Sequence, residues 1–243
     1  MPRSPRLTAL VASVGKRNAL VRCIRESARD LALDLRVVTT DASPLAPASY
    51  ESDDHVLVPR IEDARFAQDM LDVIESHEVD LVIPTIDTEL GWLASTSDAL
   101  SSMGVTAAIS SEEAVTTALD KLATAKYLRE KGLPAPATWD EPPTEPTLYP
   151  IVAKPRQGSS SVGISLLSSP ADDPGGDLVY QHQLVGPEYT VDLYVDRSGC
   201  PLATCVRERL AVRAGEVNKA RTVVHEDVTR LATEVADELP GAW

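Results

Sequence analysis

Short runs of β-branched residues alternate with amphipathic windows through the first half of the chain. Buried strands are predicted at residues 7–13, 35–40, 55–58, 80–85 and 104–109. Between them, apolar residues recur at helical spacing in the windows 18–31, 66–77 and 88–101. Strands that alternate with helices are typical of a parallel, doubly wound sheet with right-handed crossovers. We therefore expect a first α/β domain that ends near residue 110.

The second half begins with two helices and continues with strands. The first helix is predicted to start near Ser110 or Ser111, and the second to run from Asp120 to Gly132, where glycine can supply a left-handed stop. A proline-rich connector follows. Strands are then predicted at 149–155, 162–167, 178–181, 189–195 and 202–212, with a helical stripe in the tail from 223 to 239. Successive strands with few helices between them indicate an α+β arrangement.

The chain is acidic, with a net charge of −14 and a pI near 4.7. Nucleic acids and anionic membranes both favour a basic surface, so we expect neither as a partner. No apolar run approaches the roughly 18–20 residues of a membrane span. The three cysteines are scattered without CxxC spacing, which indicates reduced thiols in a cytoplasmic protein. Aromatic residues make up only 4%, so the core is expected to consist of Val, Leu, Ile and Ala.

One short stretch combines cations with a flexible polar loop. The sequence YPIVAKPRQGSSSVGI places Lys154 and Arg156 at the end of a predicted strand, directly before a Gly/Ser loop. Glycines let backbone amides approach a polyanion, and serine hydroxyls add donors. Two cations beside such a loop indicate a phosphate site in an otherwise acidic chain, although the GxxxxGK[ST] spacing of a Walker A loop is not present. The alternative is a plain β-hairpin with a soluble tip.

This stretch resembles the small-lobe hairpin of ATP-grasp enzymes, in which a strand ends in a cation before proline and a Gly/Ser-rich flap. Other segments are similar to parts of the same family, in the same order along the chain. They are DLVIPTIDTEL at 80–90, the acid–lysine pair and G-x-P-x-P exit within 110–136, the Gly-Pro-Glu-Tyr hinge within 178–192, and the basic strand pair at 207–223. The resemblance extends to stand-alone proteins similar to the large chain of carbamoyl phosphate synthetase.

The resemblance implies a fold class and a domain division. It implies an α/β chain with a Rossmann-like pre-ATP-grasp domain and a parallel sheet at 1–110, followed by an α+β ATP-grasp domain. Within the latter we expect linker helices and a small lobe at 111–185, and a large lobe at 186–243. The family's last strands, which hold Mg²⁺, would follow residue 243. We therefore expect a large lobe that lacks its last strands, and we name no metal ligand.

The resemblance also implies roles in binding ATP. Lysines would contact the phosphates as mobile point charges, and serines would close over them as a flap. The predicted cofactor site consists of Lys121, Lys154, Ser159, Ser160, Ser161, Gln181, His182, Leu184 and Glu188. Gln181 and the backbone of His182 and Leu184 would face the adenine, and Glu188 would accept hydrogen bonds from the ribose. The alternatives are surface lysines, a histidine whose side chain has no role, and a strand-edge charge at Glu188.

A basic run on a later strand completes the implied chemistry. Arg209, Arg213 and Lys219 would be catalytic, by stabilising the charge of a transferred phosphoryl group. Alternation along the strand would place Arg207, Arg209 and Arg213 on one face. The alternative is a solvated strand face.

Two acidic residues follow the carboxyl end of a predicted strand in the first domain, where open α/β sheets present ligands. Asp87 and Glu89 either recognise a substrate amine or cap the helix that begins near Thr88. We expect the cap.

As a member of this family, the chain is expected to be an ATP-dependent carboxylate–amine (or thiol) ligase that acts through an acyl-phosphate intermediate. ATP is the expected cofactor, with Mg²⁺ expected for the family. Small-molecule carboxylate and amine substrates are the expected partners, and the resemblance allows a homodimer without fixing the oligomeric state. The alternatives are a non-catalytic nucleotide-binding module, a degenerate ATP-grasp remnant, and carboxyphosphate chemistry with bicarbonate.

Overall fold

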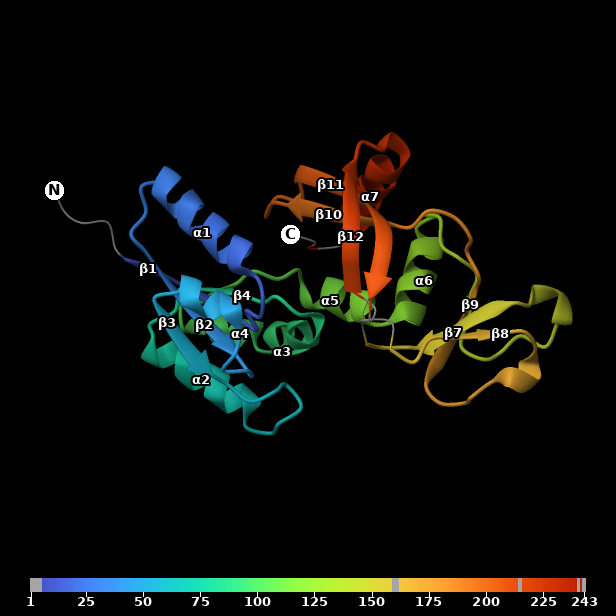
Figure 1. Cartoon of the computed structure of the whole chain (residues 1–243), viewed down its shortest axis with the longest axis horizontal. Helices are drawn as coiled ribbons and strands as arrows, with labels where there is room; N and C mark the ends of the chain where they lie inside the picture. Colours follow the sequence, from blue (N-terminus) through green and yellow to red (C-terminus); the bar gives the residue numbers. More distant parts are fainter. Residues whose placement is uncertain (1–5, 159–161, 214–215, 240, 242–243) are drawn as a thin grey trace. The chain divides into compact units, whose positions relative to one another are not determined.

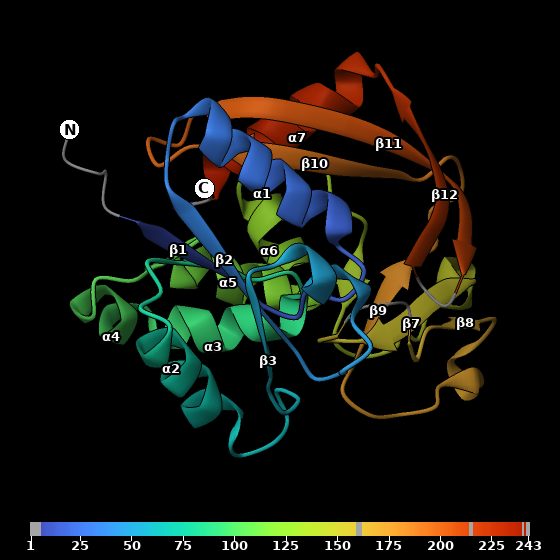
Figure 2. The same ribbon diagram turned by 60° about the vertical axis from the view of Figure 1, so that its left-hand side comes forward.

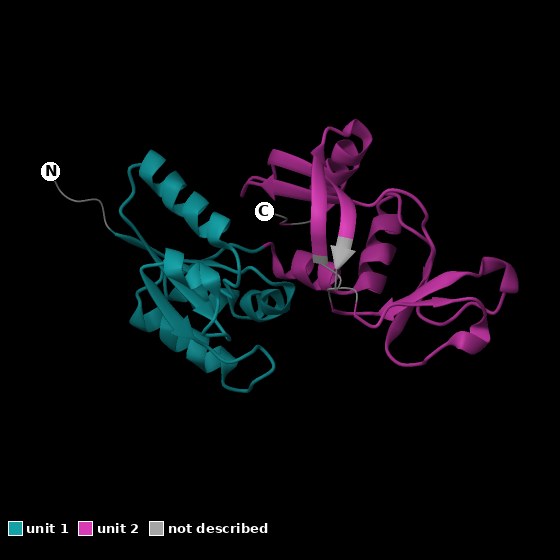
Figure 3. Cartoon of the chain, viewed as in Figure 1, with its two compact units in different colours: residues 1–109 teal, residues 110–243 magenta. Residues whose placement is uncertain are grey.

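The computed structural model describes residues 6–158, 162–213, 216–239 and 241 (Figure 1). The chain divides into two compact units, Met1–Ile109 and Ser110–Trp243, which Figure 3 shows in different colours. The further division of the second unit at residue 185 stays a prediction. Within the described residues, every helix is too short or too polar to cross a membrane.

Unit 1 is built on a five-stranded parallel sheet with the strand order β3-β2-β1-β4-β5. The strands are β1 (Leu7–Val11), β2 (Leu35–Asp41), β3 (Asp54–Leu57), β4 (Leu81–Ile83) and β5 (Thr106–Ala107). The helices are α1 (Asn18–Asp30), α2 (Phe66–Ser76), α3 (Leu90–Ser95) and α4 (Ser97–Ser102), with 3₁₀ turns η1 (Pro47–Glu51) and η2 (Asp87–Glu89). Helix α1 lies on one face of the sheet and α2 on the other (Figures 1 and 2). This arrangement confirms the doubly wound α/β fold.

The single helix predicted at 88–101 is wrong, because η2, α3 and α4 share that range. Thr96 lies at the break between α3 and α4, and its Oγ1 donates to the carbonyl of Trp92 at 2.8 Å. The hydroxyl of Ser95 donates to the same carbonyl at 2.9 Å. Side chains that bond nearby carbonyls offer the backbone an alternative to a continuous helix. The hydrophobic pattern does not report this competition.

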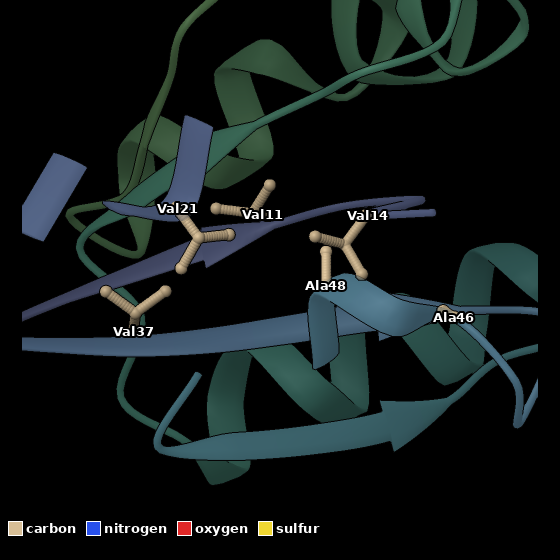
Figure 4. Close-up of a cluster of buried hydrophobic side chains, with 6 residues drawn as sticks. All are labelled: Val11, Val14, Val21, Val37, Ala46 and Ala48. Carbon is tan, nitrogen blue, oxygen red and sulfur yellow. The ribbon is translucent and has the colours of Figure 1, made fainter. Parts of the chain in front are cut away.

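The core of unit 1 consists mainly of small aliphatic side chains. Figure 4 shows one cluster, in which each side chain is at most 3% exposed: Val11, Val14, Val21, Val37, Ala46 and Ala48. The β-branched valines suit the pleated strands. The single phenylalanine, Phe66, packs edge-to-face against Trp92 with ring centroids 5.3 Å apart. This core agrees with the one expected from the low aromatic content.

The described residues of unit 2 form two antiparallel sheets and three α-helices. The first sheet has the order β6-β9-β7-β8, with β6 (Thr138–Trp139), β7 (Ile151–Pro155), β8 (Ser165–Leu167) and β9 (Leu178–His182). The second has the order β10-β11-β12, with β10 (Tyr189–Val195), β11 (Pro201–Arg213) and β12 (Glu216–Val223). The helices are α5 (Glu112–Leu119), α6 (Lys121–Glu130) and α7 (Glu226–Glu238), with 3₁₀ turns η3 (Pro146–Leu148) and η4 (Pro170–Asp172). This mixed architecture confirms the α+β class.

The observed helix ends of unit 2 agree with the start predicted near Ser111 and the stop predicted at Gly132, and the structure adds a cap at Asp120. The hydroxyl of Ser111 accepts a hydrogen bond from a backbone N–H in the first turn of α5. One carboxylate oxygen of Asp120 accepts two N–H groups of α6, at 2.9 and 3.0 Å. Gly132, just past α6, has φ +72°. The strand predicted at 162–167 begins only at Ser165, because Gly163 has φ +73°, outside the strand region.

We expect Leu10→Ala to lower the free energy of unfolding of unit 1 by about 2–5 kcal/mol, because Leu10 is fully buried in β1 and its truncation leaves a cavity. Hydrogen exchange of the β1 and β4 amides reports this change for unit 1 by itself. The control is Leu45→Ala, at a side chain that is 84% exposed, with a change below about 0.5 kcal/mol. Equal protection in the two variants would contradict the central place of β1 in the core.

Candidate functional site

Lys154 projects from β7 on the face opposite the small sheet's core. Ile151 and Ala153 of the same strand are fully buried in a cluster, and alternation places Lys154 on the other side. Gln181 of β9 lies diagonally across the strand pair, and its Oε1 accepts from Lys154 Nζ at 2.7 Å. Its Nε2 donates to Thr138 Oγ1 of β6 at 2.9 Å. A chain of two hydrogen bonds across three strands therefore orients the Gln181 amide and the Lys154 ammonium.

Lys121, the first residue of α6, is tied to the end of β7. Its Nζ donates to the carbonyl of Pro155 at 2.9 Å and to that of Gly158 at 2.8 Å. Its backbone N–H donates to the carbonyl of Arg156 at 3.1 Å. These bonds join the helix start to the segment that leads into the predicted serine flap. The flap residues Ser159, Ser160 and Ser161 lie outside the described residues.

Neither the Lys121 ammonium group nor the Lys154 ammonium group has a carboxylate partner among the described side chains. Burial lowers the pKa of Lys154, and the nearby charge of Lys121 lowers it further. Burial also lowers the pKa of Lys121, against an opposing effect of Asp120. Within the described residues, both groups bond to neutral oxygen atoms. An arriving anion would therefore be stabilised by both.

Arg156 differs from the two lysines because a carboxylate neutralises it. Its Nε and Nη2 lie 2.7 and 2.6 Å from Oδ2 of Asp120. The hydrogen bond from Arg156 lowers the pKa of the Asp120 carboxyl, in spite of the burial that raises it. The same carboxylate caps α6 through its other oxygen. The pair fixes the start of the helix that places Lys121.

A second group of charged side chains lies on the β10–β11 pair. Arg209 donates from Nη1 to Oε1 of Glu188 at 2.7 Å, and its backbone N–H donates to the Glu188 carbonyl at 2.8 Å. The Arg209 side chain is only 19% exposed, and its Nε is buried without a hydrogen bond in the described part of the chain. Arg207 forms a two-point ion pair with Asp192, at 2.6 and 3.0 Å.

The expected alternation of arginines along this strand is interrupted. The pairing register shifts between Arg209 and Ala211, and again between Ala211 and Val212. A bulge adds a residue, so strict alternation does not extend from Arg209 to Arg213. The side chain of Arg213 lies outside the described residues. Lys219 stands opposite Ala211 on β12 and is exposed.

The predicted adenine contacts lie at the end of β9. The N–H of His182 donates to the Ala137 carbonyl at 2.9 Å, so this donor is occupied by the sheet. Leu184 follows the strand and is 72% exposed. The Gln181 amide bonds to Lys154 and Thr138 instead of standing free. Lys154 thus belongs to β7, and Lys121 and Gln181 bond to residues of that strand. Glu188 pairs with Arg209.

Sequence reasoning assigned no role to Thr138, although it orients Gln181. Its strand, β6, is only two residues long, too short for any periodic signal. In the sequence, Asp120 is recognisable as half of an acid–lysine pair. Its ion pair with Arg156 follows only from the fold. Among the described residues, no group of three or more His, Cys, Asp or Glu side chains could hold a metal ion.

The cap predicted at Glu89 is wrong. Glu89 precedes α3 but makes no side-chain cap, and its side chain turns inward. It is 2% exposed, and its Oε1 accepts from the hydroxyl of Ser13 at 2.6 Å. Asp87 lies exposed in η2.

We expect Asp120→Ala to destabilise unit 2 by about 1–2 kcal/mol, because the variant loses both capping bonds and the partner of Arg156. Asp120→Asn keeps a capping oxygen and should lose less. The folded pKa of Asp120 is depressed, so its stabilisation is present above the unfolded value near 3.8 and is lost as pH falls through the folded pKa.

Urea unfolding followed by circular dichroism at pH 7 and at low pH measures this effect. Glu130→Ala, at an exposed position of the same helix, is the control, and it should change stability by less than about 0.5 kcal/mol. A loss of stability in Asp120→Ala that is the same at both pH values would exclude the carboxylate as its source.

Solved structures share the fold of the chain at low sequence identity. N5-carboxyaminoimidazole ribonucleotide synthetase from Thermotoga maritima has a TM-score of 0.64 and 16% identity over 97% of this chain and 62% of its own. L-amino acid ligase from Bacillus licheniformis has a TM-score of 0.69 and 15% identity over 98% and 61%. The biotin carboxylase domain dimer of Hydrogenobacter thermophilus 2-oxoglutarate carboxylase, in complex with MgADP, ADP and bicarbonate, has a TM-score of 0.68 and 16% identity over 97% and 58%.

The chain therefore spans less than two-thirds of the length of each of these three proteins. No curated protein sequence matches it. Two families match its sequence. Residues 9–108 match the PylC-like, N-terminal domain family, and residues 118–243, just over half of the chain, match the ATP-grasp domain family. With the two-unit fold and the lysine pair beside the β7 hairpin, this match shows that the chain belongs to the ATP-grasp domain family.

Proposed function

We propose that the chain is the ATP-binding part of an ATP-dependent carboxylate–amine (or thiol) ligase. The observation that supports this most directly is the pair formed by Lys121 and Lys154. Both ammonium groups are partly buried, both bond to neutral oxygen atoms, and neither has a carboxylate partner in the described part of the chain. In a chain of net charge −14, such a local excess of positive charge suits a polyphosphate.

The phosphates of ATP would bind at these two lysines. Lys154 now donates to the uncharged Oε1 of Gln181, and a phosphate oxygen would replace it with a charge-assisted acceptor, which forms the stronger bond. Gln181 would then face the adenine amino group, with Leu184 against the base. The serines 159–161 would close over the phosphates through their hydroxyl and backbone donors.

Glu188 and Arg209 would serve the ribose and the transferred phosphoryl group. Only Oε1 of Glu188 is bonded to Arg209, and the carboxylate is 64% exposed, so it can accept from the ribose hydroxyls. Arg209, with the unbonded Nε described above, would stabilise negative charge at the reacting phosphorus together with Arg213 and Lys219.

The proposed reaction has two steps, formation of an acyl phosphate and displacement of its phosphate by the nucleophile. A carboxylate oxygen attacks the γ-phosphorus of ATP, the bond to the β-phosphate oxygen breaks, and ADP and an acyl phosphate form. The amine or thiol then attacks the acyl carbon, loses a proton, and displaces inorganic phosphate. The cationic side chains act by positioning and by charge stabilisation, without covalent chemistry of their own. Mg²⁺ is the expected metal of such a reaction, and we assign it no residue of this chain.

The same proposal includes the substrates, the assembly and the cellular compartment. Small carboxylates and amines are the substrates, a homodimer is the expected assembly, and the cytoplasm is the expected compartment. A pure nucleotide-binding module is the competing function. It would bind ATP without hydrolysing it and without forming an acyl phosphate that hydroxylamine traps.

We expect Lys154→Ala to weaken ATP binding by about 1–3 kcal/mol, because it removes a charge-assisted donor. Isothermal titration calorimetry with and without Mg²⁺ measures the affinity. Lys126→Ala, the same charge change at an exposed position of α6, is the control and should leave the affinity within about two-fold. Unchanged ATP affinity in a folded Lys154→Ala protein would remove this lysine from the site.

We expect Glu188→Ala to reduce the discrimination between ATP and 2′,3′-dideoxy-ATP by about 1–2 kcal/mol, since only ATP offers hydroxyl donors to the carboxylate. Comparing the two nucleotides on each protein cancels any effect of the lost bond to Arg209. Glu141→Ala, at an exposed acid in the same unit, should keep the discrimination of the parent protein. If Glu188→Ala also discriminates fully, the ribose contact lies elsewhere.

A further inference from the structure

A cavity of about 320 Å³ opens in unit 1 at the carboxyl ends of its parallel strands. Ser13 follows β1, Asp41 ends β2, Val58 follows β3, and Ile86 and Glu89 follow β4. The strand order reverses at the neighbours β1 and β4, and open α/β sheets bind ligands in the crevice at such a reversal. The cavity has the position of a ligand site within unit 1 alone.

Glu89 gives this cavity an acceptor whose hydrogen bonds are incomplete. The side chain is 2% exposed, and Oε1 accepts from Ser13, whereas Oε2 is buried without a partner in the described residues. A buried polar atom with no protein partner costs free energy, so a water molecule or a ligand is expected beside it. Burial raises the pKa of Glu89, and the charge of Asp41 raises it further. A cation at Oε2 would relieve both effects.

Arg17, the cation whose charge acts on Glu89, does not fill this role. The guanidinium of Arg17 donates to the carbonyl of Thr85 at 2.8 Å and to that of Ser13 at 3.3 Å. Its charge partly opposes the shift in the pKa of Glu89, but no hydrogen bond joins the two side chains in the described structure. Among the described residues, neither Arg17 nor any other side chain therefore satisfies Oε2.

The remaining walls of the cavity define the rest of such a ligand. Val58 and Phe66 are buried and apolar. The Asp41 carboxylate, held by the backbone N–H groups of Gly15 and Ser43 at 2.8 Å, adds negative charge. Arg60 and Glu62 lie exposed in the lining and offset each other in charge. The lining thus combines a buried acid with an apolar wall, which suits a small alkyl ammonium group.

We propose that this cavity binds the primary ammonium group of a small amine, with Oε2 of Glu89 as its acceptor and the alkyl part against Val58 and Phe66. In the proposed ligase, on which this interpretation of the amine rests, the ligand would be the amine substrate. Binding itself requires only unit 1, so it does not depend on ATP. In this proposal Glu89 recognises a substrate amine, whereas it does not cap α3.

The experiment is a titration of the full chain with n-butylamine and, separately, with 1-butanol, followed by ¹H–¹⁵N NMR without nucleotide. The two probes have the same alkyl chain and differ in the charge of the head group. We expect butylamine to shift the amides of Gly15, Thr88 and Glu89 and to bind at least about ten-fold more tightly than butanol. Equal affinity of the two probes would overturn the ammonium assignment, and this comparison needs no variant.

Glu89→Gln then isolates the carboxylate, because Gln keeps the size and can still accept from Ser13. It should weaken butylamine binding about ten-fold or more and leave butanol binding unchanged. The matched control is Glu75→Gln, the same charge change at an exposed carboxylate of α2 outside the cavity lining, with an effect below about two-fold. Equal effects of the two variants would overturn the role of Glu89.

The two proposals fail separately. Normal ATP binding with no amine binding would exclude this cavity as an amine site and leave the nucleotide site standing. Amine binding in a folded chain that does not bind ATP would support the cavity and contradict the proposed ligase.

Discussion

The half-buried ammonium of Lys154 is the group on which the arrangement of the small sheet depends. An ammonium that leaves water must be given acceptors, and the sheet supplies one through the Gln181 amide. That amide is oriented in turn by Thr138 on a strand of only two residues. The register of β7 against β9 and of β9 against β6 is therefore fixed by polar bonds on one face and by the Ile151 cluster on the other. A slip of one residue would break both at once.

Each of the two units contains a buried charged side chain that bonds to an uncharged group. In unit 2, Lys154 has one neutral acceptor, and in unit 1, Glu89 has one neutral donor, the hydroxyl of Ser13. Arg156 and Asp120, in contrast, neutralise each other and serve the architecture by capping α6. The paired charge thus stabilises the fold, and in each of the two proposals the partly satisfied charge is the group that would meet a ligand of opposite charge.

Much of the fold could be predicted from the sequence because strands and helices in unit 1 have clear periods, and because Ser111 and Gly132 mark a helix start and a helix end. The misses have physical causes that act through space. Thr96 interrupts a helix with its own side chain, and Glu89 turns inward to Ser13, a residue that is 76 positions away. The shifts in register after Arg209 break the alternation on which the arginine face was predicted. For the candidate site, the lysines and the hinge could be named from the family's motifs, but the bond between Lys154 and Gln181 required the sheet.

The two carbonyls that Lys121 binds have a consequence for how a ligand and a loop influence each other. The same ammonium that would meet a phosphate also holds the carbonyl of Gly158, next to the serine segment. If an anion draws Lys121 toward itself, the bond to Gly158 weakens, and any state of the loop that keeps this bond must in turn disfavour the anion. Thermodynamic linkage makes the influence equal in both directions. In the proposed site, the affinity for a nucleotide and the bond from Lys121 to Gly158 would thus form one equilibrium, set by the reach of a single side chain.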